Sequence, residues 1–197
     1  MYCFVPHCIT ATAFACLVAA SAIAAEPDLG ALTYHPWTKT CSDDICFIGS
    51  DGHTDCGLVA GAVLIERKGE TKKTLRVMFS NRVRLEAGVR IVIGDNEAIE
   101  RPYVSCFASG CTADYDTGPE LVDELKRART LALKATDKAN SPIEVSLPLV
   151  DFAKSYDGLS HNLKVILEVH PTAAEMQARL DRDRRVLEER KARCEAR

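Results

Sequence analysis

Cysteines are the residues of this 197-residue chain most capable of chemistry, and there are nine of them. Two pairs share one spacing, with four residues between the partners: Cys41 with Cys46, and Cys106 with Cys111. Redox enzymes commonly use a C-x-x-C spacing at a helix start, which activates one thiol. The wider spacing instead predicts two short disulfide-closed turns. The second turn lies in the stretch 101–116, which we interpret as a β-hairpin closed by Cys106–Cys111.

Two acids follow the second cysteine pair and offer an alternative, enzymatic interpretation. Asp114 and Asp116 are two residues apart, so they share one face of the strand after Cys111. A hydrolase could use them as paired carboxylates, and a thiol–disulfide enzyme could use Cys106 and Cys111. The common nucleophile, zinc-protease, phosphate-loop and dinucleotide motifs are absent from the sequence. We therefore predict no catalytic residue and no cofactor.

A metal site is considered at Asp51, His53 and Asp55, which alternate along the segment 50–57. The spacing does not match a calcium loop, and a single histidine falls short of a zinc site. We predict that this segment is a polar loop without a metal.

The first residues resemble an export signal. An uncharged apolar run, 9–25, ends in small residues suited to cleavage after Ala24 or Ala25. The run is short for a lasting membrane anchor, which is the alternative, so no integral span is expected in the mature chain. Six cysteines remain after cleavage, and an even number in an exported chain favours disulfides. The last two, Cys56 and Cys194, could form a third bridge within one chain or between two chains.

The composition is that of a soluble domain with a core. Apolar residues make up 47% and charged residues 27% of the chain, which argues against a disordered chain. The net charge of -3 gives no electrostatic basis for nucleic-acid binding.

The apolar pattern predicts a mainly β domain: an antiparallel β-sandwich or flattened barrel with one short packed helix and a charged C-terminal helix. Trp37 is expected to be a packing anchor. The predicted strands are 58–67, 74–79, one or two strands within 83–93, 131–136, 143–147 and 163–169. Helices are predicted at 119–128 and, as a short turn, at 149–156. The predicted divisions are a signal peptide at 1–25, a flexible lead-in at 26–36, the β-rich domain at 37–170 and the charged helix at 171–197.

The C-terminal helix allows two interpretations. Its few apolar positions include Leu180, Leu187 and Cys194, seven residues apart on one face. Two heptad steps are too few to predict a coiled coil, so the helix is either solvated or an arm for self-association or partner docking.

Several of these motifs together resemble the invasion-associated locus B family of exported Gram-negative bacterial proteins, over about residues 37–159. The residues that carry the likeness are Trp37 with Cys41 and Cys46, the segments 83–91 and 102–106, Gly110-Cys111-Thr-Ala113, Leu147-Pro-Leu-Val-Asp-Phe152-Ala, and Tyr156-Asp-Gly158. One departure is Phe79-Ser80-Asn81, where a Leu-Pro type of turn is usual. The helix after Thr172 lies beyond the pattern.

The resemblance implies a periplasmic protein, or one exported to the outer membrane or cell surface, from a family named for bacterial entry into host cells. No catalytic residues come with the family. The favoured function is therefore non-enzymatic interaction with an envelope or host-surface protein, contributing to virulence. The alternatives are the enzyme described above and a periplasmic chaperone or ligand-binding β-sandwich, which a large apolar pocket would favour.

Overall fold

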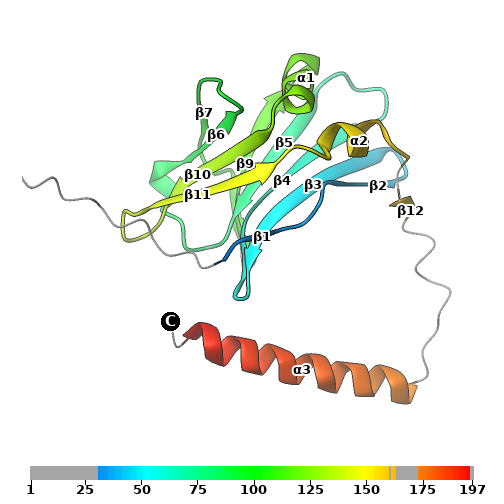
Figure 1. Cartoon of the computed structure of the whole chain (residues 1–197), viewed down its shortest axis with the longest axis vertical. Coiled ribbons are helices and arrows are strands. Elements are labelled where there is room, and N and C mark those ends of the chain that lie inside the picture. Colours follow the sequence, from blue (N-terminus) through cyan, green and yellow to red (C-terminus); the bar gives the residue numbers. More distant parts are fainter. Residues whose placement is uncertain (1–30, 160, 163–172, 196–197) are drawn as a thin grey trace, which may run out of the picture.

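Two antiparallel β-sheets pack into a sandwich in the computed structural model, which describes residues 31–159, 161–162 and 173–195 (Figure 1). The sandwich prediction is confirmed, and the two sheets do not merge into a closed barrel in the described part of the chain. The predicted signal peptide and the predicted strand 163–169 lie outside the described residues.

The larger sheet has the strand order β12-β2-β3-β4-β5-β9-β8, with β1 paired to β3. Neighbouring strands are antiparallel, except that β12 is parallel to β2. The strands are β1 (Thr33–Tyr34), β2 (Thr38–Ser42), β3 (Ile45–Thr54), β4 (Gly57–Arg67), β5 (Lys73–Phe79), β8 (Ser105–Phe107), β9 (Gly110–Thr117) and β12 (His161–Asn162).

The smaller sheet has the order β11-β10-β6-β7, built from β6 (Val89–Ile93), β7 (Ile99–Arg101), β10 (Thr130–Thr136) and β11 (Pro142–Pro148). Apolar residues alternate along the strands of both sheets and point inward, because successive side chains of a strand leave opposite faces. The fully buried core includes Ile48, Leu64, Leu75, Val77 and Phe79 from the larger sheet and Ile91, Leu131, Leu133, Val145 and Leu147 from the smaller one.

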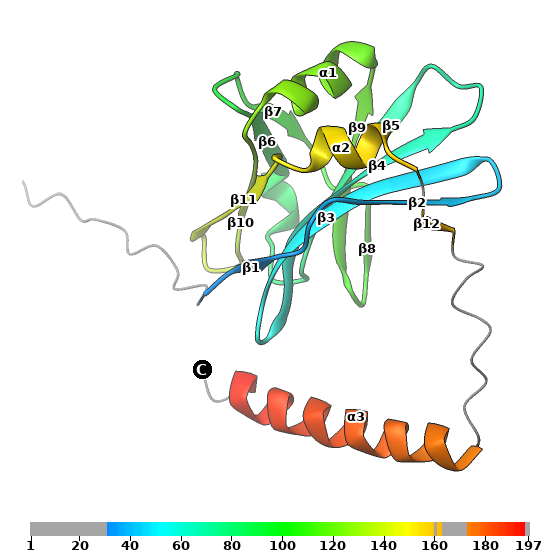
Figure 2. The same ribbon diagram turned by 45° about the vertical axis from the view of Figure 1, so that its right-hand side comes forward.

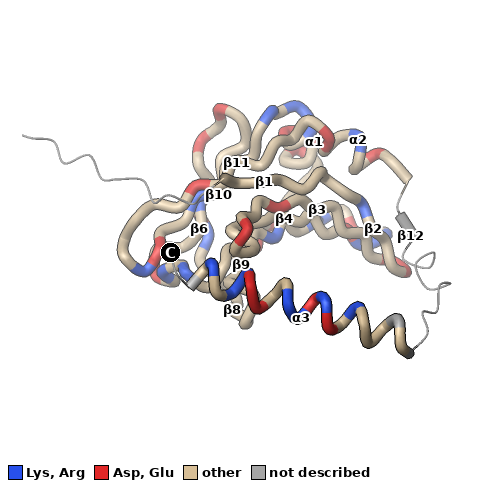
Figure 3. Tube along the Cα trace, turned by 60° about the horizontal axis from the view of Figure 1, so that its bottom comes forward, with Lys and Arg blue, Asp and Glu red and all other residues tan. Residues whose placement is uncertain are grey.

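Two short helices lie at one end of the sandwich, and a long helix lies apart from it (Figures 1 and 2). The helices are α1 (Pro119–Arg127), α2 (Phe152–Asp157) and α3 (Ala173–Glu195), with a 3-10 turn at Leu85–Ala87. Pro119 begins α1, where its missing N–H costs nothing. Charges of both signs run along α3 (Figure 3), whose apolar residues, such as Leu180 and Leu187, are exposed. None of the described helices is long and apolar enough to span a membrane.

Trp37 fixes α2 against the core. Its ring is 3% exposed and packs edge-on against Phe152, with the ring centroids 4.9 Å apart. The indole Nε1–H donates to the Pro148 carbonyl at 2.7 Å, so the polar atom of this buried ring is satisfied. The Ser155 hydroxyl donates in turn to the Trp37 carbonyl at 2.6 Å. The tryptophan is thus the packing anchor that the sequence predicts.

Two local predictions are wrong. The predicted polar loop 50–57 is mostly strand, because β3 continues to Thr54 and pairs with β4 along its whole length. The predicted hairpin 101–116 is shorter, since Arg101 belongs to β7 of the smaller sheet and only β8 and β9 form the hairpin. Within 83–93, where one or two strands are predicted, the structure has one, β6, and Val83 makes an isolated bridge to Asp137.

A hydroxyl group links the two sheets inside the core. Tyr115 of β9 is 1% exposed, and its OH donates to the Val89 carbonyl of β6 at 2.8 Å. Burial raises the pKa of Tyr115 above its ordinary value, so the phenol keeps its proton. Tyr103 is the contrasting case: its buried OH has no hydrogen-bond partner among the described residues, and burial raises its pKa to about 12.

We expect Tyr115→Phe to lower the free energy of unfolding by about 1–2 kcal/mol, because the Val89 carbonyl loses a buried donor. Tyr103→Phe should cost less than about 0.5 kcal/mol or stabilise the protein, since it removes an unpaired hydroxyl. Urea unfolding of the oxidised protein measures both values. Equal losses in the two variants would contradict a specific role for the Tyr115 bond.

Candidate functional site

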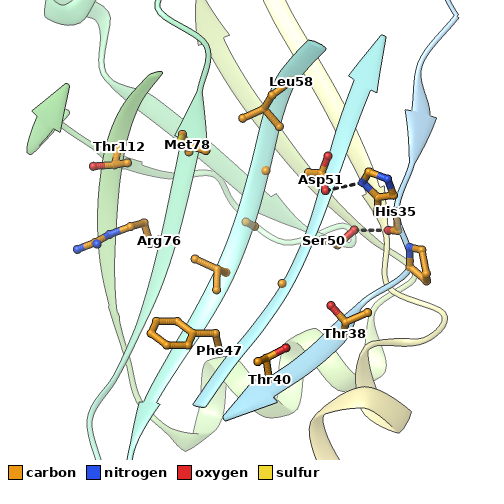
Figure 4. A pocket seen from close by; sticks show the side chains of 15 residues that line it. His35, Thr38, Thr40, Phe47, Ser50, Asp51, Leu58, Arg76, Met78 and Thr112 are labelled. Carbon is orange, nitrogen blue, oxygen red and sulfur yellow. Dashed lines mark hydrogen bonds and ion pairs between the residues drawn. The ribbon is translucent and has the colours of Figure 1, made fainter. Parts of the chain in front are cut away.

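The outer face of the larger sheet carries an apolar groove of about 840 Å³ (Figure 4). It lies on the face opposite the core, because it is lined by the alternate residues of the same strands. Phe47 of β3, Val63 of β4 and Met78 of β5 supply apolar side chains. Thr38 and Thr40 of β2 and Thr112 of β9 place hydroxyl groups around it. The remaining lining residues are His35, Pro36, Gly49, Ser50, Asp51, Leu58, Gly61, Ala62 and Arg76.

Glycines create the depth of the groove. Gly49 and Gly61 lie on neighbouring strands and leave space where side chains would stand. A Cβ atom at Gly61 would lie 3.0 Å from the Asp51 Cβ, closer than such atoms ordinarily approach. The glycine therefore hollows the sheet and lets Asp51 keep its position.

Arg76 and Asp114 form an ion pair at one side of the groove. The Nε and Nη2 atoms of Arg76 donate to the two Asp114 oxygens, both at 2.7 Å. This hydrogen bonding raises the pKa of Arg76 further, although burial opposes the shift. The sequence suggested Asp114 and Asp116 as paired carboxylates. Instead both oxygens of Asp114 accept hydrogen bonds from Arg76, and Asp116 is an exposed residue opposite Thr74.

The six cysteines of the described chain are joined in three disulfides: Cys41–Cys46, Cys56–Cys194 and Cys106–Cys111. The first and third close the turns between β2 and β3 and between β8 and β9. The second joins the β3–β4 turn to the last turn of α3 across a separation of 138 residues.

The hairpin around Cys111 depends on Gly110. This residue has φ of 150°, and a Cβ there would lie 2.2 Å from the Phe79 carbonyl oxygen of β5. Any side chain would therefore push β9 away from β5. The Gly110-Cys111 motif thus holds the stapled hairpin against the sheet, which is a structural role.

Peptide mapping without reduction should recover these three pairs. The mature protein, without the three cysteines of the predicted signal peptide, should contain no titratable thiol. Because Cys111 is buried, we expect slow reduction of Cys106–Cys111 by a dithiol. A Cys41–Cys106 cross-link would contradict the pairing. Fast, reversible two-electron reduction, with a reductase activity lost in Cys106→Ser, would instead support the enzymatic alternative.

A partly buried polar network lies between the larger sheet and α2. Glu66 accepts hydrogen bonds from Lys73 and from the Tyr156 hydroxyl, the latter at 2.6 Å. The Lys73 ammonium also donates to that hydroxyl at 2.7 Å. Burial opposes the charge of Glu66, but these hydrogen bonds outweigh it, so the pKa of Glu66 lies below its ordinary value. An ionised carboxylate in an ion pair is a poor general acid or base near neutral pH, so the network is structural.

Glu66→Gln should lower the free energy of unfolding at pH 7 by about 1–2 kcal/mol, because Lys73 loses its counter-charge. The ordinary pKa of 4.5 applies to the unfolded chain. The contribution of Glu66 is therefore complete above this pH and is lost as the pH falls through the lower pKa of the folded protein.

In urea unfolding, the free energy of unfolding should fall less between pH 7 and pH 3.5 in Glu66→Gln than in the parent protein. Glu144→Gln is the matched control, since its pair with Lys134 is exposed. Identical pH dependence in the parent and Glu66→Gln would contradict this role.

Two histidines and an aspartate converge at the end of the groove (Figure 4 shows His35 and Asp51). The Nδ1 of His35 lies 2.9 Å from Asp51 Oδ1, and the Nδ1 of His53 lies 3.5 Å from Asp51 Oδ2. Asp55, which the sequence grouped with Asp51 and His53, lies outside the cluster. His35 was not part of that group because it lies 16 residues before Asp51, and only the pairing of β1 with β3 brings it there.

Comparison with known proteins finds a matching family and similarity to solved structures. The model of the family described as invasion associated locus B (IalB) protein matches residues 37–160. The crystal structure of invasion associated protein B from Bartonella henselae superposes with a TM-score of 0.55 at 17% sequence identity. The match covers 65% of this chain and 94% of that chain. No curated protein sequence matches the chain.

Proposed function

The chain belongs to the invasion-associated locus B family, and on this premise we propose that it is an exported, non-enzymatic interaction protein that binds a protein partner in the outer-face groove. Its place would be the periplasm, the outer membrane or the cell surface. Three disulfides support an oxidising compartment. The partner would be an envelope or host-surface protein, and this contact would contribute to host-cell invasion.

The observation that carries the proposal is the groove itself. Soluble proteins bury apolar side chains or expose them singly, and a hollow apolar surface rimmed by polar groups marks a binding site. Here the strands that bury Leu64 and Val77 inside present Val63 and Met78 outside. The side chains that the sequence offered as candidates for catalysis have other partners: Asp114 is paired with Arg76, and Cys106 and Cys111 are oxidised to a disulfide. The family is also not known as an enzyme family.

An apolar segment of a protein fits the groove better than an acyl chain. The rim offers the hydroxyl groups of Thr38 and Thr40. Beside them lie Thr112, Arg76 and Asp51, which already have partners within the chain. A peptide supplies N–H and C=O groups for the Thr38 and Thr40 hydroxyls while its side chains fill the floor, whereas an acyl chain leaves these two hydroxyls without partners. The groove nevertheless also favours the related alternative of a ligand-binding β-sandwich, which the experiment distinguishes.

Val63→Lys should abolish partner binding, because it places an unpaired charge on the apolar floor. The immobilised oxidised protein is incubated with detergent-solubilised bacterial envelopes and, separately, with host-cell surface proteins, and retained proteins are identified by mass spectrometry. The amount of a partner protein that the parent protein retains should fall at least tenfold with Val63→Lys.

Val104→Lys is the matched control, because this exposed valine lies outside the groove and its replacement should leave capture unchanged. Equal capture by Val63→Lys and the parent would contradict the proposed site. If a lipid copurifies with the parent protein and is lost in Val63→Lys, the groove binds a small ligand and not a protein partner.

A further inference from the structure

The His35–Asp51–His53 cluster has the composition of a metal site. Asp51 and His53 are two residues apart on β3 and therefore leave the same face of the strand. His35 follows β1, and its backbone N–H donates to the Asp51 carbonyl at 3.0 Å, which fixes it beside them. Three potential ligands are thus held by backbone pairing, independently of any contact between their side chains.

The side chains point their donor atoms at one another. The imidazole rings of His35 and His53 are stacked, with centroids 4.3 Å apart and planes 19° apart. Both present Nδ1 to the single Asp51 carboxylate. The Nδ1 of His53 is buried yet makes no hydrogen bond to any described residue. Its contact with Asp51 Oδ2 is 3.5 Å long and does not form a hydrogen bond. A buried ring nitrogen that makes no hydrogen bond is costly, and a bound cation would satisfy it.

We propose that these three residues bind a divalent transition-metal ion of the Zn²⁺ or Cu²⁺ class. Two imidazole nitrogens and one carboxylate oxygen suit such ions and do not suit Ca²⁺ or Mg²⁺, which prefer oxygen alone. One donor atom from each residue lies within 4.8 Å of the others. Ligand atoms of a tetrahedral zinc site with bonds of about 2.0–2.1 Å lie about 3.4 Å apart, so the side chains need to close by up to about 1.5 Å. Three protein ligands leave a coordination position for water or a partner group.

Two arginines at the end of α3 lower the affinity of this site for a cation. A cavity of about 400 Å³ contains the cluster and is also lined by Asp55, Arg190 and Arg193. The two arginines belong to the end of α3 that Cys194 ties to Cys56. Their positive charges oppose cation binding, and Asp51 and Asp55 offset them. Removing the arginine charges should therefore strengthen metal binding, a direction that a merely structural His–Asp contact would not produce.

Isothermal titration of the full oxidised protein with Zn²⁺ tests the proposal. We expect one ion per chain, with affinity reduced more than about tenfold in His35→Ala, His53→Ala and Asp51→Asn. Asp55→Asn is the matched control, with the same charge change in the same cavity, and should change the affinity less than about threefold. Arg190→Gln with Arg193→Gln should increase the affinity. Electron paramagnetic resonance of the Cu²⁺ complex should show imidazole nitrogens that disappear in the histidine variants.

Circular dichroism establishes that each variant is folded. The proposal is overturned if the parent protein binds Zn²⁺ more weakly than about 1 mM, if His53→Ala binds like the parent, or if Asp55→Asn weakens binding as much as Asp51→Asn. The site is separable from partner capture, since Val63→Lys should bind Zn²⁺ like the parent protein. A failure of one proposal therefore leaves the other intact.

Discussion

The structure depends on burying the inner faces of its two sheets against each other. Each strand alternates its side chains between two faces, so the residues that fill the core determine which residues face outward. Leu64 and Val77 point inward, and Val63 and Met78 consequently line the outer groove. The outer groove and the core are therefore two sides of the same strands, and a change of register would exchange them.

Hydrogen bonds fix the orientation of α2 and of the two sheets where apolar packing alone does not. The Trp37 indole and the Glu66–Lys73–Tyr156 network secure α2, and the Tyr115 hydroxyl joins the sheets through the core. Each bond satisfies a group that would otherwise be buried without a partner. Such directional bonds complement non-directional burial: packing brings the elements together, and hydrogen bonds select one arrangement.

The three disulfides act at different ranges. Cys41–Cys46 and Cys106–Cys111 close local turns that the sheet already holds, whereas Cys56–Cys194 positions an otherwise separate helix. A bridge of that separation removes far more freedom from the unfolded chain than a local one. It also brings the arginine-rich end of α3 to the His35–Asp51–His53 cavity. The charged helix α3 thus adds two arginine side chains to a cavity at one end of the family domain.

The sequence by itself determined a mainly β domain, either a sandwich or a flattened barrel, together with the first packed helix, the role of Trp37 and the family. Period-two alternation, Pro119 and the cysteine motifs are local signals. It could not separate strand from loop at 50–57, since the polar residues there alternate on an outer face. Only the tertiary structure decided that Asp114 pairs with Arg76, that glycines hollow a groove and that His35 meets His53. These relations arise between strands, and pairing across strands leaves no trace in local spacing.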